Sequence, residues 1–495
     1  MRDNNLCKGS SKQWHSWQDK TGMPYALTYW YDLHIFSISG LPLETFSALS
    51  ADELIDFVAR HGLFLFCQNI LNENEFPMVH GLIGNKKTTP FLSRSGGCMA
   101  MKCKVGRYTG YIVSAGAWGW NDIPDKTFLE SLLSVFKLVG FQAVTPASTS
   151  EKLLASTLPE QKIYIPSTVL RRDILDNNVG GRIDKAVPGF HHVVTKYDKN
   201  KAYLHKSRYV VSPYRAPFHR HKPALEEIYD YPTGWWKCEI VASDVHIPPV
   251  QINGRKPVPG EVFERWLWTG EVLDCTEVGY QVKIQKGYGF PEMSNFMEQW
   301  SDVLWELYIV AEGYHEYARK ILKSMMVGVP GRMLRRPEKL RLVHVSEATL
   351  QDIDIKIVWK EGGKTCCDWL IRVEPDNSTG QLSQVGSFIV AEMRRELYHE
   401  MLRFELMGHN VIMSYIDCIS VDGIPEYYDK EGKNLGEYKS EYYWNMYSEE
   451  NRWIAQKDPY SWEEDIMKYP GLRTLDQEVA FWRKYRQFQG NYLNI

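Results

Sequence analysis

The sequence lacks the features that mark secreted, membrane-spanning and zinc-binding proteins. Its nine cysteines form no Cys-x-x-Cys motif, and neither Cys98 with Cys103 nor the adjacent Cys366-Cys367 fits a zinc finger or a disulfide framework. No apolar run is long enough to span a membrane, and the first residues contain no apolar core of a signal peptide. We therefore expect an intracellular, cytoplasmic protein with reduced thiols and no membrane partner.

The chain also lacks a strong net charge. Its 58 Lys and Arg residues against 61 Asp and Glu give −3 at pH 7, so any nucleic-acid site must be a local basic surface. Aromatic residues are abundant, with 17 Trp and 29 Tyr; most are expected in the core, and some could stack on bases. At 495 residues the chain is too long for one core, and roughly two to four domains are expected.

Hydrophobic patterning predicts an α/β domain at the N-terminal end, with no internal repeat anywhere in the chain. Strand-like residues at 25–38 and helix-like residues at 51–61 indicate this domain. A break is expected at 145–148, where Pro146 interrupts the pattern. Strands are expected at 235–241 and 280–288.

Two long helices are predicted in the second half. Apolar residues recur at three- and four-residue steps over 296–325, and the glycines and proline of 328–331 should end that helix. The second helix carries an apolar stripe from Val390 to Phe404. The polar and aromatic C-terminal residues, 426–495, suggest a small helical cap.

Two aspartates end strand-like segments that lie far apart in the sequence. Asp417 falls where the alternation of 411–423 requires an inward apolar residue, and Asp198 closes a β-branched run. Either residue alone is typical of an ordinary turn. A buried carboxylate is costly unless it binds a cation or a strong donor. Together they predict a divalent-metal site of the nucleotidyl-transfer type, in which carboxylates hold Mg²⁺ against phosphates.

Four motifs surround and include these aspartates. They are Gly180-Gly181-Arg182, D-K-N-K-A-Y from Asp198, K-I-L-K-S-M-M-V-G from Lys320, and Y-I-D-C-I from Tyr415. In this order they resemble the family B DNA polymerases, particularly the small protein-primed, viral and plasmid branch. That family has a Gly-Gly turn followed by motif A (D-x-N-S-x-Y-P), motif B (K-x-x-x-N-S-x-Y-G) and motif C (D-T-D-S). The resemblance covers roughly residues 145–440.

The resemblance implies an α+β right-hand fold with an antiparallel palm sheet, fingers and thumb, preceded by an α/β exonuclease-like domain. The expected domains are a degenerate exonuclease-like domain at 1–145, palm with motif A at 146–223, a palm insertion at 224–295, fingers at 296–335, palm with motif C at 336–425, and thumb at 426–495.

The resemblance also implies a template-directed DNA polymerase that adds dNTPs to a primer 3′-hydroxyl in the replication of a virus or mobile element. Asp198 and Asp417 would hold two Mg²⁺ ions, for which Mn²⁺ could substitute, with the backbone carbonyl of Lys199 as a further ligand. Primer–template DNA and dNTPs would be its partners, and a priming protein is a further candidate. If the source is a virus, the enzyme would act in the host cell.

The remaining site residues follow from the same motifs. Tyr203 would pack under the incoming sugar and exclude a 2′-hydroxyl, and Lys320 would grip the triphosphate. The full assignments are Lys199, Tyr203, Lys320 and Ser324 for the nucleotide, and Gly180, Gly181, Arg182, Arg335 and Lys439 for DNA.

Motif C departs from the family pattern, so two registers are open. In the preferred one Tyr415 replaces the first Asp of D-T-D and Asp417 is the metal-binding second Asp. In the other, Asp417 is the first Asp and Ile419 occupies the catalytic position, which leaves an inactive site. Two other functions therefore stay open: an inactive polymerase-like protein that binds DNA, and a reverse transcriptase-like palm enzyme.

The N-terminal domain resembles a proofreading exonuclease only weakly. Its nearest match to the D-x-E motif is Asp32-Leu33-His34, in which the glutamate is missing. We therefore expect no proofreading.

Overall fold

The computed structural model describes most of the chain, and every structural statement below refers to this part. The described residues are 27–31, 34–37, 50–70, 79–83, 85–92, 98–140, 143–159, 161–184, 187–313, 316–335, 338–344, 356–361, 364–375, 381–449, 452–458 and 461–466. The contacts within the chain divide it into two units. Unit 1 is Met1–Asp176, Ser207–Ala216 and Met293–Ser387, and unit 2 is Asn177–Lys206, Pro217–Glu292 and Phe388–Ile495.

Unit 1 begins with a mixed six-stranded sheet in the order β2-β1-β3-β6-β5-β4. The central strands β1, β3 and β6 are parallel, and the outer pairs are antiparallel. The strands are β1 (Leu27–Tyr31), β2 (His34–Ser37), β3 (Phe64–Cys67), β4 (Thr88–Leu92), β5 (Cys98–Val105) and β6 (Tyr108–Ser114). Around them lie α2 (Ala51–Arg60), α3 (Val79–Leu82), η2 (Ala115–Trp118) and α4 (Lys126–Val139). This mixed α/β arrangement agrees with the sequence pattern.

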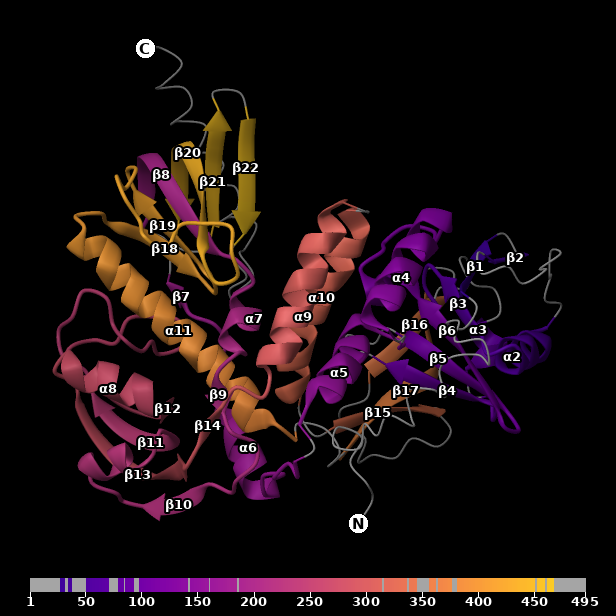
Figure 1. Cartoon of the computed structure of the whole chain (residues 1–495), viewed down its shortest axis with the longest axis horizontal. Helices are drawn as coiled ribbons and strands as arrows, with labels where there is room; N and C mark the ends of the chain where they lie inside the picture. The colour runs from indigo at the N-terminus through magenta and orange to yellow at the C-terminus, as the bar shows by residue number, and fades with distance from the viewer. Residues whose placement is uncertain are drawn as a thin grey trace. The chain divides into compact units, whose positions relative to one another are not determined.

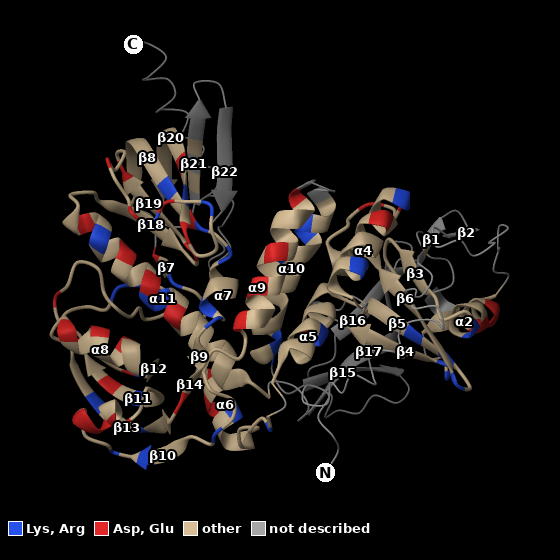
Figure 2. Cartoon of the chain, viewed as in Figure 1, with Lys and Arg blue, Asp and Glu red and all other residues tan. Residues whose placement is uncertain are grey.

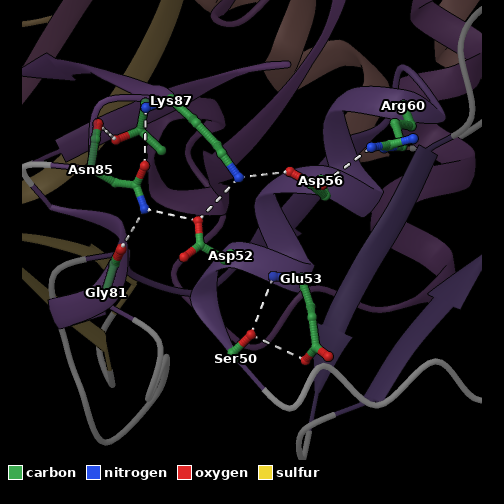
Figure 3. Close-up of polar contacts among 9 residues, drawn as sticks. Ser50, Asp52, Glu53, Asp56, Arg60, Gly81, Asn85 and Lys87 are labelled. Carbon is green, nitrogen blue, oxygen red and sulfur yellow. Dashed lines mark hydrogen bonds and ion pairs between the residues drawn. The ribbon is translucent and has the colours of Figure 1, made fainter. Parts of the chain in front are cut away.

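Polar contacts fix the start of α2 (Figure 3). Ser50 caps the helix by accepting a hydrogen bond from the Glu53 N–H. Lys87 Nζ lies 3.3 Å from Asp52 Oδ1 and 3.1 Å from Asp56 Oδ1, so one ammonium bridges two carboxylates of the helix. The apolar side of α2 packs into the core of the six-stranded sheet.

The other helices of unit 1 pack on one another. They are α5 (Pro146–Thr157), α6 (Thr168–Asn177), α9 (Glu298–Val310), η4 (Ala311–Gly313) and α10 (Glu316–Met333). The short strands β9 (Val210–Val211) and β14 (Met293–Ser294) pair, and a three-stranded sheet contains β15 (Glu338–His344), β17 (Lys364–Pro375) and β16 (Lys356–Glu361). α10 packs against α4, α5 and α9.

Unit 2 contains a seven-stranded sheet in the order β22-β21-β20-β8-β19-β18-β7. The strands are β7 (Ile183–Asp184), β8 (Gly189–Lys199), β18 (Val411–Tyr415), β19 (Cys418–Asp422), β20 (Tyr438–Glu449), β21 (Arg452–Asp458) and β22 (Ser461–Ile466). Helix α11 (Ser383–Leu406) packs on one face through Leu397, Met401 and Phe404 (Figure 1). These residues belong to the stripe expected from the sequence, because successive apolar residues at helical spacing lie on one side.

A second, four-stranded sheet of unit 2 has the order β10-β13-β11-β12. Its elements are β10 (Phe218–His221), η3 (Glu226–Asp230), β11 (Thr233–Val241), β12 (Val262–Trp268), α8 (Thr269–Glu277) and β13 (Gln281–Phe290). Trp236, Leu267 and Val272 bury α8 against one face of this sheet. α7 (Ala202–Lys206) follows β8.

Three expectations about secondary structure are wrong. The single long helix is two helices, α9 and α10, and α10 continues through Gly328 to Met333. A Cβ on Gly328 would lie 2.8 Å from Ala147 Cα, so this glycine permits close packing of α10 on α5. Pro146 does not mark a break but lies at the first turn of α5, where a proline is favourable. Residues 438–449 form β20, because they pair with β8, and not a helical cap.

Candidate active site

The face of the seven-stranded sheet opposite α11 carries Asp198 at the end of β8. Directly paired residues of neighbouring strands share a face, and Asp198 pairs with Cys418 on one side and Lys439 on the other. Two residues before Asp198 on β8, and therefore on the same face, Lys196 pairs with Ser420 of β19 and Glu441 of β20. The Asp198 side chain keeps 36% of its surface exposed. We call the face defined by these residues the open face.

Asp417 lies beside Asp198 because a tight turn brings it there. Tyr415 pairs with Cys418, so Ile416 and Asp417 form the two-residue turn between β18 and β19. The Lys199 N–H donates to the Asp417 carbonyl at 2.9 Å, which ties the turn to the end of β8. Ile416 has φ +58°, a strained value for a β-branched residue. Its N–H donates to the Arg182 carbonyl at 2.7 Å, which holds the turn in place.

Ile419 occupies the other position that motif C leaves open. Its side chain is fully buried in the core with Tyr197 and Phe404, on the face covered by α11. A group in that position cannot reach a ligand on the open face. Asp417 is the one carboxylate of the Tyr415–Ile419 segment, and it lies in the turn that is hydrogen-bonded to the end of β8.

Asp417 and Asp198 both lie close enough to the Cys418 thiol to affect its pKa. Burial raises the pKa of the Cys418 thiol to about 12, an effect to which both Asp417 and Asp198 contribute. Burial also raises the pKa of Tyr203, and the charge of Asp417 raises it further. Tyr203 lies on α7, close enough to Asp417 for the charge of that carboxylate to affect its pKa.

The donor set fits a divalent cation that shares its coordination with phosphates. Among the described residues, no cluster of three or more His, Cys, Asp or Glu side chains could hold a metal. Two carboxylates are nevertheless the usual protein contribution for Mg²⁺, which keeps water and phosphate oxygens as its other ligands. The Lys439 ammonium already lies 3.9 Å from Asp198 Oδ2, so the site attracts a cation.

Lys199 takes no part through its side chain. Its ammonium points to the α11 face, where it pairs with Glu396 and lies 5.0 Å from the centre of the Tyr438 ring. Lys206 Nζ also contacts Glu396, at 2.8 Å. Burial would raise the pKa of Glu396, but Lys206 and Lys199 lower it to about 2. The metal contact expected of the Lys199 backbone carbonyl is compatible with this position, whereas a nucleotide contact of its side chain is not.

The expectation that Arg182 contacts DNA is wrong for its side chain, which is buried. The guanidinium makes two hydrogen bonds to Asp184, of 2.6 and 2.8 Å, and donates to the Pro248 carbonyl at 2.8 Å. Gln251 Nε2 also donates to Asp184 Oδ1 at 2.6 Å. These contacts connect β7 to the segment before β12, so Arg182 is a structural residue.

The Gly180-Gly181 turn is held between α11 and the motif C hairpin. Arg394 on α11 donates to the carbonyls of Val179 and Gly180, and is itself held by Glu271 at 2.8 Å. A Cβ on Gly181 would lie 3.0 Å from the Ile416 side chain. Neither glycine has positive φ. The space at Gly181, and not backbone conformation, is what requires a glycine.

Asn200 connects motif A to the segment that carries Lys439. Its amide donates to the Gly432 carbonyl at 2.9 Å, and its backbone exchanges hydrogen bonds with Glu437 and Gly436. Because β20 begins directly after this segment, these bonds fix where Lys439 meets Asp198.

The other predicted residues belong to unit 1. Lys320 is exposed on α10, and the Ser324 hydroxyl donates to the Lys320 carbonyl at 3.1 Å. Arg335 follows α10 and is half-buried near Glu151. Burial raises the pKa of Glu151, and the charges of Arg332 and Arg335 partly offset this rise. Asp32 and Leu33 lie outside the described residues.

Sequence reasoning missed the charged residues that hold this site. The side chains of Arg394, Glu396 and Glu400 on α11 are 10%, 14% and 3% exposed. Basic and acidic residues both recur along α11 (Figure 2). A signal was present, because Arg394 is four residues after Val390 and therefore lies on the apolar side of the helix. Charged residues on such a stripe need partners, which periodicity does not identify.

Comparisons with known proteins agree with the motifs. Residues 125–362 match the family of DNA polymerases type B, organellar and viral. The structure of phi29 DNA polymerase complexed with primer-template DNA and incoming nucleotides has a TM-score of 0.68, with 15% identity over 92% of this chain and 94% of that chain. Its binary complex with primer-template DNA gives 0.66, at 15% identity and the same coverage. No curated protein sequence matches the chain. The fold is thus the expected α+β class.

Proposed function

Because the chain is a divergent family B DNA polymerase of the organellar and viral type, we propose that unit 2 contains its palm and that Asp198 and Asp417 are its catalytic carboxylates. The main support is the turn at Ile416, which brings Asp417 beside Asp198 at the edge of the open face. The reaction is the template-directed addition of dNTPs to a primer 3′-hydroxyl.

Asp198 and Asp417 would hold two Mg²⁺ ions, with the Lys199 carbonyl as a further ligand and Mn²⁺ as a substitute. When bound, such ions activate the primer hydroxyl and neutralise the triphosphate. The two carboxylates would orient these groups, and the hydrogen bond from the Lys199 N–H to the Asp417 carbonyl holds the Asp417 turn at the end of β8. The buried Cys418 thiol, whose residue pairs with Asp198, stays protonated, since burial raises its pKa to about 12.

Tyr203 would exclude ribonucleotides. Its half-buried ring lies near Asp417, and a ring in this position leaves no room for a 2′-hydroxyl. In the Tyr203→Ala variant, discrimination against ribonucleotides should fall by roughly tenfold or more, the effect of a steric contact. Incorporation of rNTP and dNTP is compared for parent and variant, and equal discrimination would contradict this role.

Lys320 and Ser324 on α10 remain the proposed nucleotide contacts of the fingers, and Arg335, Gly180 and Gly181 the proposed DNA contacts. Lys439 is proposed for the primer strand, because it lies on the open face beside Asp198. The domain ranges derived from the motifs are also proposals.

Primer extension tests the catalytic assignment. A labelled primer–template is incubated with dNTPs and Mg²⁺ or Mn²⁺, using the parent, Asp198→Asn and Asp417→Asn. Loss of a metal ligand should reduce the rate by roughly 10³-fold, since metal ions supply several kcal/mol. Thermal unfolding should be nearly unchanged, because both side chains are partly exposed. An Asp417→Asn variant with parental activity would refute the assignment.

The alternatives give different results. A reverse transcriptase-like enzyme would extend on an RNA template as well as on DNA. An inactive, DNA-binding protein would give no extension with any metal or template, and no metal-dependent shift of its melting temperature.

Among the described residues, no helix is long and apolar enough to cross a membrane. We propose an intracellular site of action, in the host cytoplasm for a viral source.

A further inference from the structure

One lysine of the open face lies between two carboxylates. Lys439 Nζ is 3.0 Å from Glu441 Oε1 and 3.9 Å from Asp198 Oδ2. Asp198 is a proposed metal ligand, whereas Glu441 lies one step further along β20, beside Lys196. The ammonium therefore has two alternative partners, of which only one is required for catalysis.

Glu441 is well suited to hold this lysine. The Tyr443 hydroxyl donates to Glu441 Oε2 at 3.2 Å, and Lys196 Nζ lies 3.9 Å from the same oxygen. Burial would raise the pKa of Glu441, but the hydrogen bond and charge of Lys439, with the charge of Lys196, lower it overall. Glu441 is therefore an ionised acceptor with a fixed orientation.

A divalent cation and an ammonium compete for one carboxylate. As the cation binds Asp198, the Lys439 ammonium is repelled and must move. Glu441 provides the nearer acceptor, and the Lys439 and Asp198 side chains are 49% and 36% exposed, so the exchange needs little desolvation. If Glu441 lost its charge, Asp198 would be the other carboxylate of this contact that could pair with the Lys439 ammonium.

We propose that Glu441 is a positioning residue that holds the Lys439 ammonium away from Asp198 and so keeps this carboxylate available to a divalent cation. The inference rests on the proposed function in one respect, that Asp198 and Asp417 bind the cation. It adds that metal affinity depends on a residue that does not touch the metal.

A double-mutant cycle in the full chain tests the inference. Mn²⁺ affinity is measured by electron paramagnetic resonance of the free ion, without DNA or nucleotide, in the parent, Lys439→Met, Glu441→Gln and the double variant. Lys439→Met should tighten binding in both backgrounds. The gain in Mn²⁺ affinity caused by Lys439→Met should be roughly two- to fivefold larger in the Glu441→Gln background than in the parent, the range expected for an exposed ion pair. A simple charge effect of Glu441 would give equal gains in both backgrounds, and this result would overturn the inference.

Two controls separate this inference from the proposed function. Glu264→Gln removes a carboxylate that pairs with Lys237 at 2.6 Å in the four-stranded sheet, and it should leave Mn²⁺ affinity unchanged. An effect as large as that of Glu441→Gln would overturn the inference.

Asp198→Asn and Asp417→Asn should each weaken Mn²⁺ binding. Unaltered binding in both would refute the proposed metal site, whereas weakened binding with equal Lys439→Met gains refutes only the role of Glu441. Thermal melts of all variants verify folding.

Discussion

Unit 2 contains two sets of ion pairs that differ in exposure. Between α11 and α8, Arg394 pairs with Glu271, and their side chains are 10% and 5% exposed. On the open face, Lys439 contacts Asp198 and Glu441, with 49% of its side chain exposed. Both sets join a basic side chain to carboxylates, but the first set is withdrawn from water and the second is not.

This difference separates structural from exchangeable charges. A buried ion must keep its partner, because an unpaired charge in the interior costs several kcal/mol. An exposed pair contributes little, so its members can change partners when a metal or phosphate arrives. The buried pairs thus hold the Gly-Gly turn and the helix, and the open-face charges are available for chemistry.

The largest effect on stability should come from Arg394→Met. This change removes the guanidinium that pairs with the buried Glu271 carboxylate and that donates to the Gly180 carbonyl. The free energy of unfolding should fall by roughly 3–5 kcal/mol, measured by urea denaturation. Arg394→Met combined with Glu271→Leu should recover part of the loss, since the interior then no longer holds the Glu271 carboxylate without its guanidinium. If Arg394→Met lowered the free energy of unfolding no more than Glu264→Gln does, burial would not decide the role of these charges.

Glu396→Gln should have an intermediate, pH-dependent effect. The pKa of Glu396 is lowered from 4.5 to about 2 by Lys206 and Lys199, so its ionisation stabilises the fold above pH 4.5 and is lost as the pH falls toward 2. At pH 7 the variant should lose roughly 3 kcal/mol. The difference in melting temperature from the parent should shrink between pH 5 and pH 3, and a constant difference would contradict the assignment.

Lys196→Met should have the smallest effect on stability. Its pair with Glu441, at 3.9 Å, lies on the open face, so the free energy of unfolding should change by less than about 1 kcal/mol. If DNA crosses this face, the slope of log affinity against log salt should decrease by about one. An unchanged salt dependence in a filter-binding assay would place DNA away from Lys196.

Local patterns in the sequence were sufficient for the elements that carry their own periodicity. The alternation of β18 and β19, the apolar stripe of α11 and the strands β11 and β13 agree with the structure. The motif order also agrees with the type B polymerase family model that matches residues 125–362, and with the α+β class of the fold. These features depend on residues close together in the chain, so a single sequence contains their signal.

Tertiary structure alone decided the roles that depend on distant partners. Arg182 is buried because Asp184 and the Pro248 carbonyl enclose it, and α10 continues past Gly328 because α5 packs there. Strand β20 forms in place of the expected helix because β8 supplies its hydrogen bonds. Charge and helix propensity are local properties, but desolvation and strand pairing are set by whichever residues the fold brings alongside.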